Sequence, residues 1–191
     1  MEREILLLGD SRLGATCRPV TAGELDDMAA LGRDLQDTLR AFRRQYGAGR
    51  GIAAPQIGAP VRVVYLEWPE PRVLLNPELH DLADETFELW DDCMSFPELM
   101  VRVRRHASCL LRYRDLNWTS HEERAHGDLA ELLQHEVDHL DGVLAVSRAV
   151  HPQAFALRRQ LEQAGELPAR FRDPAAPGAD VPNRSAPAGT R

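Results

Sequence analysis

The stretch Gln134-His135-Glu136-Val137-Asp138-His139 decides how the rest of this chain is interpreted. Its two histidines are four residues apart, so on a helix both imidazoles share one face and can reach one metal ion. The glutamate between them can then face a water bound to that ion. A surface helix that holds two histidines by chance is the alternative, but a helical pattern over residues 128–140 surrounds the match. We therefore predict a metal site on this helix.

A third protein ligand is needed if the metal is to keep one coordination position open for water. One large class of zinc proteases carries a third histidine where this chain has Ala145, which argues against that class. Another class uses a glutamate from a later helix, and Glu162 and Glu166 are available here. Cys93 is the upstream candidate, because a thiolate binds divalent metals strongly, although a lone cysteine is usually a small buried hydrophobe. The residues alone leave these candidates open.

The remainder of the chain predicts an α+β domain. Thr21 and Glu24 form a capping box ahead of a helix over residues 22–46, which ends at Gly47. A third helix is expected from Pro152 to residue 164. Strands are expected over residues 61–67, 73–75, 87–89, 101–103 and 108–114. Residues 165–191 are rich in Pro, Ala and Gly, so we predict a catalytic domain over 1–164 and a disordered tail over 165–191.

Composition excludes several classes of protein. The net charge is −7 over 191 residues, and without a face rich in Lys or Arg we expect no binding to nucleic acid. The apolar run at residues 5–8 is shorter than the roughly 7–15 residues of a secretory signal. No stretch approaches the roughly 20 apolar residues of a membrane span, so a cytoplasmic protein is expected. An odd number of cysteines, three, makes a disulfide framework unlikely.

Three segments together resemble the motifs of the peptide deformylase family, in the family's order. They are Gly49-Arg50-Gly51-Ile52-Ala53-Ala54-Pro55-Gln56, Asp91-Asp92-Cys93-Met94-Ser95 and the helical stretch quoted above. The resemblance covers residues 5–150, and residues 5–10 look like the family's N-terminal strand. It implies mixed or antiparallel sheets packed around a central helix that carries the metal motif. It also implies a hydrolase that removes the formyl group from formyl-methionyl nascent polypeptides and releases formate.

The resemblance also assigns roles to individual residues. By it, one divalent ion is held by Cys93, His135 and His139, with Fe²⁺ the expected metal and Zn²⁺ or Ni²⁺ also able to occupy the site. Glu136 would transfer protons. The Gln56 side chain and the Met94 backbone N–H would stabilise charge on the formyl oxygen. Substrate would lie extended beside the segment that contains Gly49, Gly51 and Ile52.

Several residues depart from the family's pattern. The second motif usually reads Glu-Gly-Cys-Leu-Ser, whereas this chain has Asp91, Asp92 and Met94. Arg50 stands where an apolar residue is common. Asp128 and Glu131 lie on the metal-facing side of the helix, where the family's apolar residues help to form the pocket for the methionine side chain. If both carboxylates face the pocket, we expect it to be more negative, with altered preference for the first residue or slow turnover. The alternative is that Asp128 only caps the helix and that both carboxylates are solvated; it is favoured for Asp128, and Glu131 is left open.

Three functions remain open from the sequence. The first is a deformylase, including one that acts on another N-formyl peptide or a small formamide. The second is a metallopeptidase in which Glu162 replaces Cys93 as the third ligand. The third is a binding protein descended from a deformylase. For the deformylase we expect N-formylated nascent peptides at the ribosome as partners, a monomer, and no contact with nucleic acid or membrane.

Overall fold

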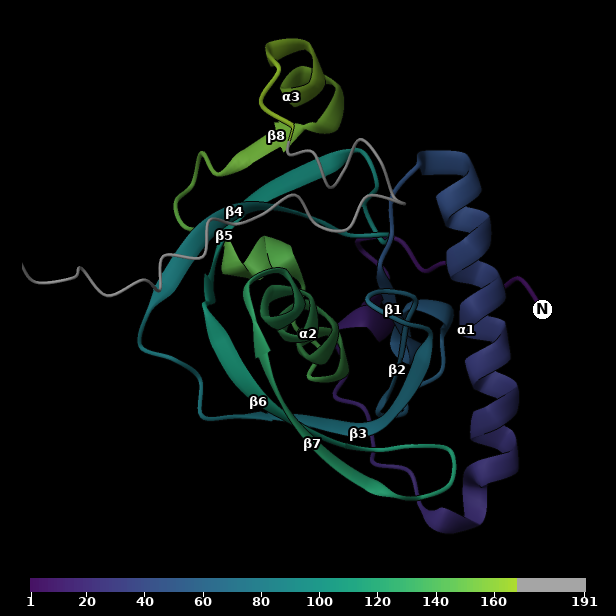
Figure 1. The fold of residues 1–191 in the computed structure, drawn as a ribbon. Helices are drawn as coiled ribbons and strands as arrows, with labels where there is room; N and C mark the ends of the chain where they lie inside the picture. The colour runs from purple at the N-terminus through teal and green to yellow at the C-terminus, as the bar shows by residue number, and fades with distance from the viewer. Residues whose placement is uncertain (168–191) are drawn as a thin grey trace, which may run out of the picture.

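The computed structural model describes residues 1–167, which form two antiparallel sheets (Figure 1). The larger sheet has the strand order β1-β2-β3-β6-β7, with β1 at Gly51–Ala53, β2 at Val63–Leu66, β3 at Arg72–His80, β6 at Ser108–Arg114 and β7 at Ser120–His126. The smaller sheet has the order β4-β5-β8, with β4 at Thr86–Asp92, β5 at Leu99–His106 and β8 at Phe155–Leu157. The predicted α+β class with antiparallel sheets is confirmed.

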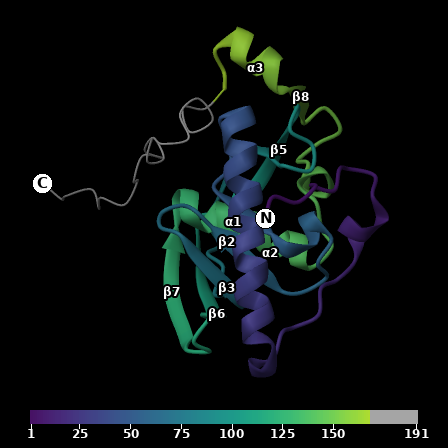
Figure 2. The same cartoon turned by 90° about the vertical axis from the view of Figure 1, so that its right-hand side faces the viewer.

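The α-helices occupy different layers of the molecule. They are α1 at Leu25–Tyr46, α2 at Gly127–Leu140 and α3 at Arg158–Ala164. Figure 1 shows α2 between the two sheets, and α2 contacts strands of both. In Figure 2, α1 runs along the outer side of the larger sheet, in front of β2 and β3, while α3 lies beyond β8 at the edge of the molecule. Side chains on α2 are therefore held from both sides.

Helix α2 is buried over most of its length. Every residue from Ala130 to Leu140 is buried, as expected for a helix enclosed by other elements. Gln134 links this helix to β5, because its side chain accepts a hydrogen bond from the His106 N–H and donates one to the His106 carbonyl, both at 2.9 Å. The Gln134 amide thus provides hydrogen-bond partners for both backbone groups of His106 and fixes the helix against the smaller sheet.

Helix α1 begins and ends where the sequence indicates. The Thr21 backbone N–H and hydroxyl both donate to Glu24 at 2.8 Å, which confirms the capping box. Residues 22–24, predicted as helix, form a 3₁₀ turn before the α-helix starts. Gly47 ends the helix in the left-handed conformation with φ of 64°. Leu35, Leu39 and Phe42 belong to the core cluster that α1 shares with the larger sheet.

Strands β3, β4 and β5 run beyond their predicted bounds, and strand β7 is an addition to the prediction. Strand β3 continues past Asn76 to His80, because a bulge between Leu75 and Glu78 absorbs the irregular backbone and Asn76 adopts a φ of 50°. The Asn76 amide is held by hydrogen bonds to both the N–H and the carbonyl of Val20. Strand β7 was not predicted, since its charged sequence lacks an apolar pattern, yet it pairs with β6 along its whole length.

The predicted third helix is wrong in its first half. Phe155–Leu157 form β8, which pairs with Leu99–Val101 of β5, and α3 starts only at Arg158. The open edge of β5 offers backbone hydrogen-bond partners that outweigh local helical preference. The helix ends at Gly165 as expected. Leu167 is buried against Leu161 and Met100, while residues 168–191 of the predicted tail lie outside the described residues.

The N-terminal segment is extended but does not form the expected strand at residues 5–10. Instead, the Leu6 N–H donates to the Gln56 carbonyl and the Leu8 N–H donates to the Ser95 carbonyl, both at 2.8 Å. The segment therefore joins the first and second motifs. Within residues 1–167, none of the helices has the length and apolar character needed to cross a membrane.

Candidate metal centre

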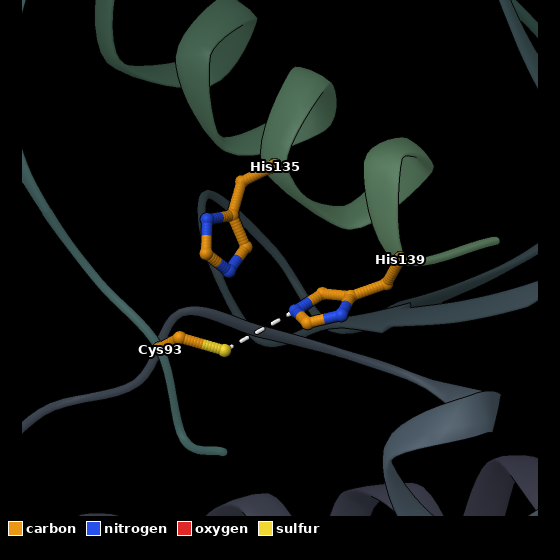
Figure 3. Close-up of side chains that lie close together, drawn as sticks. All are labelled: Cys93, His135 and His139. Carbon is orange, nitrogen blue, oxygen red and sulfur yellow. Dashed lines mark hydrogen bonds between the residues drawn. The ribbon is translucent and has the colours of Figure 1, made fainter. Parts of the chain in front are cut away.

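Cys93, His135 and His139 come together in the interior of the protein (Figure 3). Their potential ligand atoms all lie within 4.8 Å of one another, and Cys93 Sγ is 3.3 Å from His139 Nε2. The histidines lie one turn apart on α2, whereas Cys93 follows the end of β4. With metal–ligand bonds of about 2.0–2.3 Å, ligand atoms at such separations can share one tetrahedral ion. The donor set therefore fits a divalent metal.

Asp91 fixes the orientation of His135. The His135 Nδ1 atom lies 3.0 and 3.1 Å from the two carboxylate oxygens of Asp91, which leaves Nε2 facing the cluster. Burial opposes ionisation of Asp91, but the charges of His135 and Arg105 outweigh it and hold the pKa of this carboxyl below its usual range. Burial, followed by repulsion from His135, lowers the pKa of His139 and favours the neutral imidazole that binds metals.

Asp91 also belongs to a buried network of ion pairs. Arg105 is 3% exposed and contacts Asp91 at 3.0 Å and Asp138 at 2.5 Å. Asp138 also pairs with Arg148 at 2.6 Å. Sequence reasoning missed both arginines. Asp138 was the available signal, since a carboxylate on the buried face of this helix requires a cationic partner.

Glu136 lies against the glycine of the first motif. A Cβ atom on Gly51 would stand 2.7 Å from Glu136 Oε1, so only glycine permits this close approach. Glu136 is buried, and its Oε2 atom has no hydrogen-bond partner within residues 1–167. Burial raises the pKa of Glu136 to about 7. A carboxylate with this pKa can exchange protons near neutral pH.

Gln56 is held in one orientation by the backbone. Its Oε1 accepts a hydrogen bond from the Ala53 N–H at 2.9 Å, and its Nε2 lies 3.6 Å from Cys93 Sγ and 3.4 Å from Ser95 Oγ. The amide N–H groups therefore face the cluster. Met94 follows Cys93 in the chain, and its side chain is buried in the core beside α1.

The predicted substrate-binding segment lies at the edge of the larger sheet. Strand β1 is the first in the strand order, and its one partner among the described strands is β2. Ile52 pairs with Tyr65 and is fully buried. Gly49 has a φ of 116°, a conformation that favours glycine. The other edge of β1 can accept an extended chain through backbone hydrogen bonds.

Arg50, Glu131 and Asp92, which depart from the family's pattern, all form ion pairs. Arg50 forms an ion pair with Glu131, which is 1% exposed, so of the two alternatives left open for Glu131 the solvated one does not hold. Asp128 lies in the first turn of α2, after the N-cap residue His126. Asp92 contacts Arg158 at 2.5 Å and lies in β4 without a positive φ, so it carries no backbone strain of that kind.

Glu162 and Glu166 are not part of the cluster. Among residues 1–167, the ligand group at this site consists of Cys93, His135 and His139. Glu162 lies on α3, beyond β8 and away from α2 (Figure 1). The geometry therefore favours Cys93 as the third ligand over a glutamate from the last helix.

Comparisons with known proteins agree with this arrangement. The model of the polypeptide deformylase family matches residues 2–155. A peptide deformylase of Hyphomonas neptunium is 38% identical over 151 residues, which cover 75% of this chain and 82% of that protein. One of Rhodopseudomonas palustris is 34% identical over 178 residues, which cover 88% of this chain and 95% of that protein.

Solved structures show the same likeness. The crystal structure of peptide deformylase from Thermotoga maritima matches with a TM-score of 0.73 and 29% identity, covering 79% of this chain and 99% of that chain. A peptide deformylase from Synechococcus elongatus in complex with actinonin matches with a TM-score of 0.72 and 30% identity, covering 85% and 86% of the two chains.

Proposed function

Because this chain belongs to the peptide deformylase family, it removes the N-formyl group from nascent peptides, and we propose that Cys93, His135 and His139 hold the metal for this reaction. The observation that carries the assignment is the convergence of one sulfur and two imidazoles within 4.8 Å. In this proposal α2 is the central helix that supplies both histidines and the glutamate between them. Fe²⁺ is the proposed metal because the family resemblance favours it; the ligand set itself also accepts Zn²⁺ or Ni²⁺ and does not select among the three.

Glu136 is the proposed proton carrier. When bound, a divalent ion acts as a Lewis acid that makes water a nucleophile near neutral pH and polarises the formyl carbonyl. Glu136 takes the proton from the attacking water and later gives it to the leaving amine nitrogen. Its buried position beside Gly51 excludes bulk water from the carboxylate. The products are formate and a peptide with a free amino terminus.

Two groups are proposed to stabilise the negative charge that grows on the formyl oxygen. The Gln56 side chain is one, because its oxygen is already held by the Ala53 N–H and its Nε2 faces the cluster. The Met94 backbone N–H is the other, because Met94 directly follows the ligand Cys93. The Gln56 amide is already oriented in the free protein, since its oxygen accepts from the Ala53 N–H.

The peptide is proposed to add to the edge of β1. The segment with Gly49, Gly51 and Ile52 ends the larger sheet, and main-chain hydrogen bonds there tolerate many sequences. That tolerance suits an enzyme that processes many nascent chains at the ribosome. We propose that it does so as a monomer.

Formate release from formyl-Met-Ala-Ser by anaerobically prepared Fe²⁺ protein tests the assignment. Cys93→Ala should lose both metal and activity, whereas Glu136→Gln should keep the metal and lose activity. Glu162→Ala is the matched control and should keep both, because Glu162 lies on α3 away from the cluster. Retention of metal by Cys93→Ala together with its loss from Glu162→Ala would instead support the metallopeptidase arrangement.

A further inference from the structure

An ion pair between Arg50 and Glu131 borders the proposed reaction centre. Glu131 precedes His135 by four residues on α2, so the two side chains share one face of the helix. Arg50 directly precedes Gly51, the residue whose Cα packs against the Glu136 carboxylate. The pair therefore joins the residue that precedes β1 to the N-terminal half of α2.

Arg50 is fixed at both ends. Its guanidinium pairs with Glu131, donates to the Asp128 carbonyl at 3.3 Å and lies 5.8 Å from the centre of the Trp68 ring. Its own carbonyl accepts a hydrogen bond from the Glu67 N–H at 2.8 Å. The Arg50 side chain is 19% exposed, whereas Glu131 is 1% exposed. Arg50 thus forms the accessible surface of the pair, with Glu131 behind it.

The covalent structure of a formyl peptide brings the side chain of its first residue close to this pair. The Cβ atom of the first residue is separated from the formyl carbon by only the amide nitrogen and Cα, a span of roughly 4 Å. A formyl group beside Glu136 and the cluster therefore places that side chain against the walls next to Glu136. Arg50 and Glu131 are charged residues near Glu136 on the side of β1 and α2.

Resting on the proposed function, we infer that the Arg50–Glu131 pair determines which first residue is accepted and favours a polar, hydrogen-bonding side chain such as glutamine over methionine. An apolar side chain packed against the pair removes water from both charges and gives no hydrogen bond in return. A carboxamide can accept from the Arg50 guanidinium and donate to the Glu131 carboxylate. Glutamine and methionine have similar length, so the comparison isolates polarity.

The test compares kcat/KM for formyl-Gln-Ala-Ser, formyl-Met-Ala-Ser and formyl-norleucyl-Ala-Ser with the Fe²⁺ enzyme. The parent enzyme should process the glutamine peptide at least as well as the methionine peptide. The double variant Arg50→Leu with Glu131→Ile replaces the pair by apolar groups and should shift the ratio towards methionine by about tenfold or more. Arg62→Leu with Asp141→Ala, which removes an ion pair outside this wall, should leave the ratio unchanged.

The outcomes separate this inference from the proposed function. Strong preference of the parent enzyme for methionine, or a ratio unchanged in the double variant, would overturn the inference while leaving deformylation intact. Formate release from none of the three peptides would overturn both. The ratio in the parent enzyme is informative by itself, so the inference stays open to refutation even where the double variant fails to fold.

Discussion

The Nδ1 atom of His135 lies 3.1 Å from Oδ2 of Asp91, and the same carboxylate oxygen contacts Arg105 at 3.0 Å. This oxygen therefore connects the proposed metal ligand to the buried charge behind it. Because a histidine that donates through Nδ1 presents Nε2 to a metal, Asp91 acts as a positioning residue for His135. Its side chain is one methylene shorter than the glutamate common in the family, yet it reaches the ring.

Replacing Asp91 by Asn should weaken metal binding by about 10–100-fold, because the amide cannot supply the negative charge that orients and polarises His135. Competition with a chelator measures the affinity. Asp92→Asn is the matched control, since Asp92 contacts Arg158 rather than His135 and should change the affinity little. Equal effects of the two substitutions would contradict the role given to Asp91.

Replacing Arg105 by Met should destabilise the protein by about 3–5 kcal/mol, because Asp91 and Asp138 would remain buried beside it without their shared cation. Urea unfolding of the metal-free protein measures the free energy. Arg104→Met is the control: Arg104 is 60% exposed and its pair with Glu88 is screened by water, so stability should barely change. A small effect of Arg105→Met would show that Arg148 and His135 are sufficient partners for Asp138 and Asp91.

Replacing Gly51 by Ala should lower kcat/KM by about 100-fold, since displacement of a catalytic group by an ångström has effects of that size. The added methyl would stand 2.7 Å from Glu136 Oε1 and would push the carboxylate from its position. Metal content should not change, because the atoms nearest to the added methyl belong to Glu136 and Leu66 rather than to the ligands. Gly14→Ala, where a Cβ meets nothing within 4 Å, should behave as the parent enzyme does.

Local sequence determined the parts of this structure that depend on neighbouring residues. The spacing of His135 and His139 and the capping box at Thr21 are properties of a single helix, and both were predictable. Strand β8 was not, because Phe155–Leu157 pair with a strand more than 50 residues earlier in the chain. Strand β7 was missed because its residues are charged, and its strand conformation comes from pairing with β6.

The contacts of the candidate site likewise include some that join residues far apart in the chain, which local sequence could not predict. Cys93 could be placed beside the histidines only through the resemblance, because no local rule links positions 93 and 139. The pair of Arg50 and Glu131 joins residues 81 positions apart, and sequence analysis treated them as two separate departures. Arg105 was likewise one of three nearby arginines until the fold buried it beside Asp91. These contacts depend on how the two sheets enclose α2.

The metal-free protein should become less stable as pH rises, through the titration of Glu136. Burial raises the pKa of this carboxyl from 4.5 to about 7, so between these values the folded state binds more protons than the unfolded state. Stability contributed by the protonated acid is complete below pH 4.5 and is lost as pH rises through 7, a change of about 3 kcal/mol for a shift of this size. The variant Glu136→Gln tests this, because glutamine does not titrate.

Urea unfolding should therefore find the variant more stable than the metal-free parent at pH 8, with a smaller difference at pH 5.5. A difference that stays constant between these pH values would mean that Glu136 titrates near its ordinary pKa.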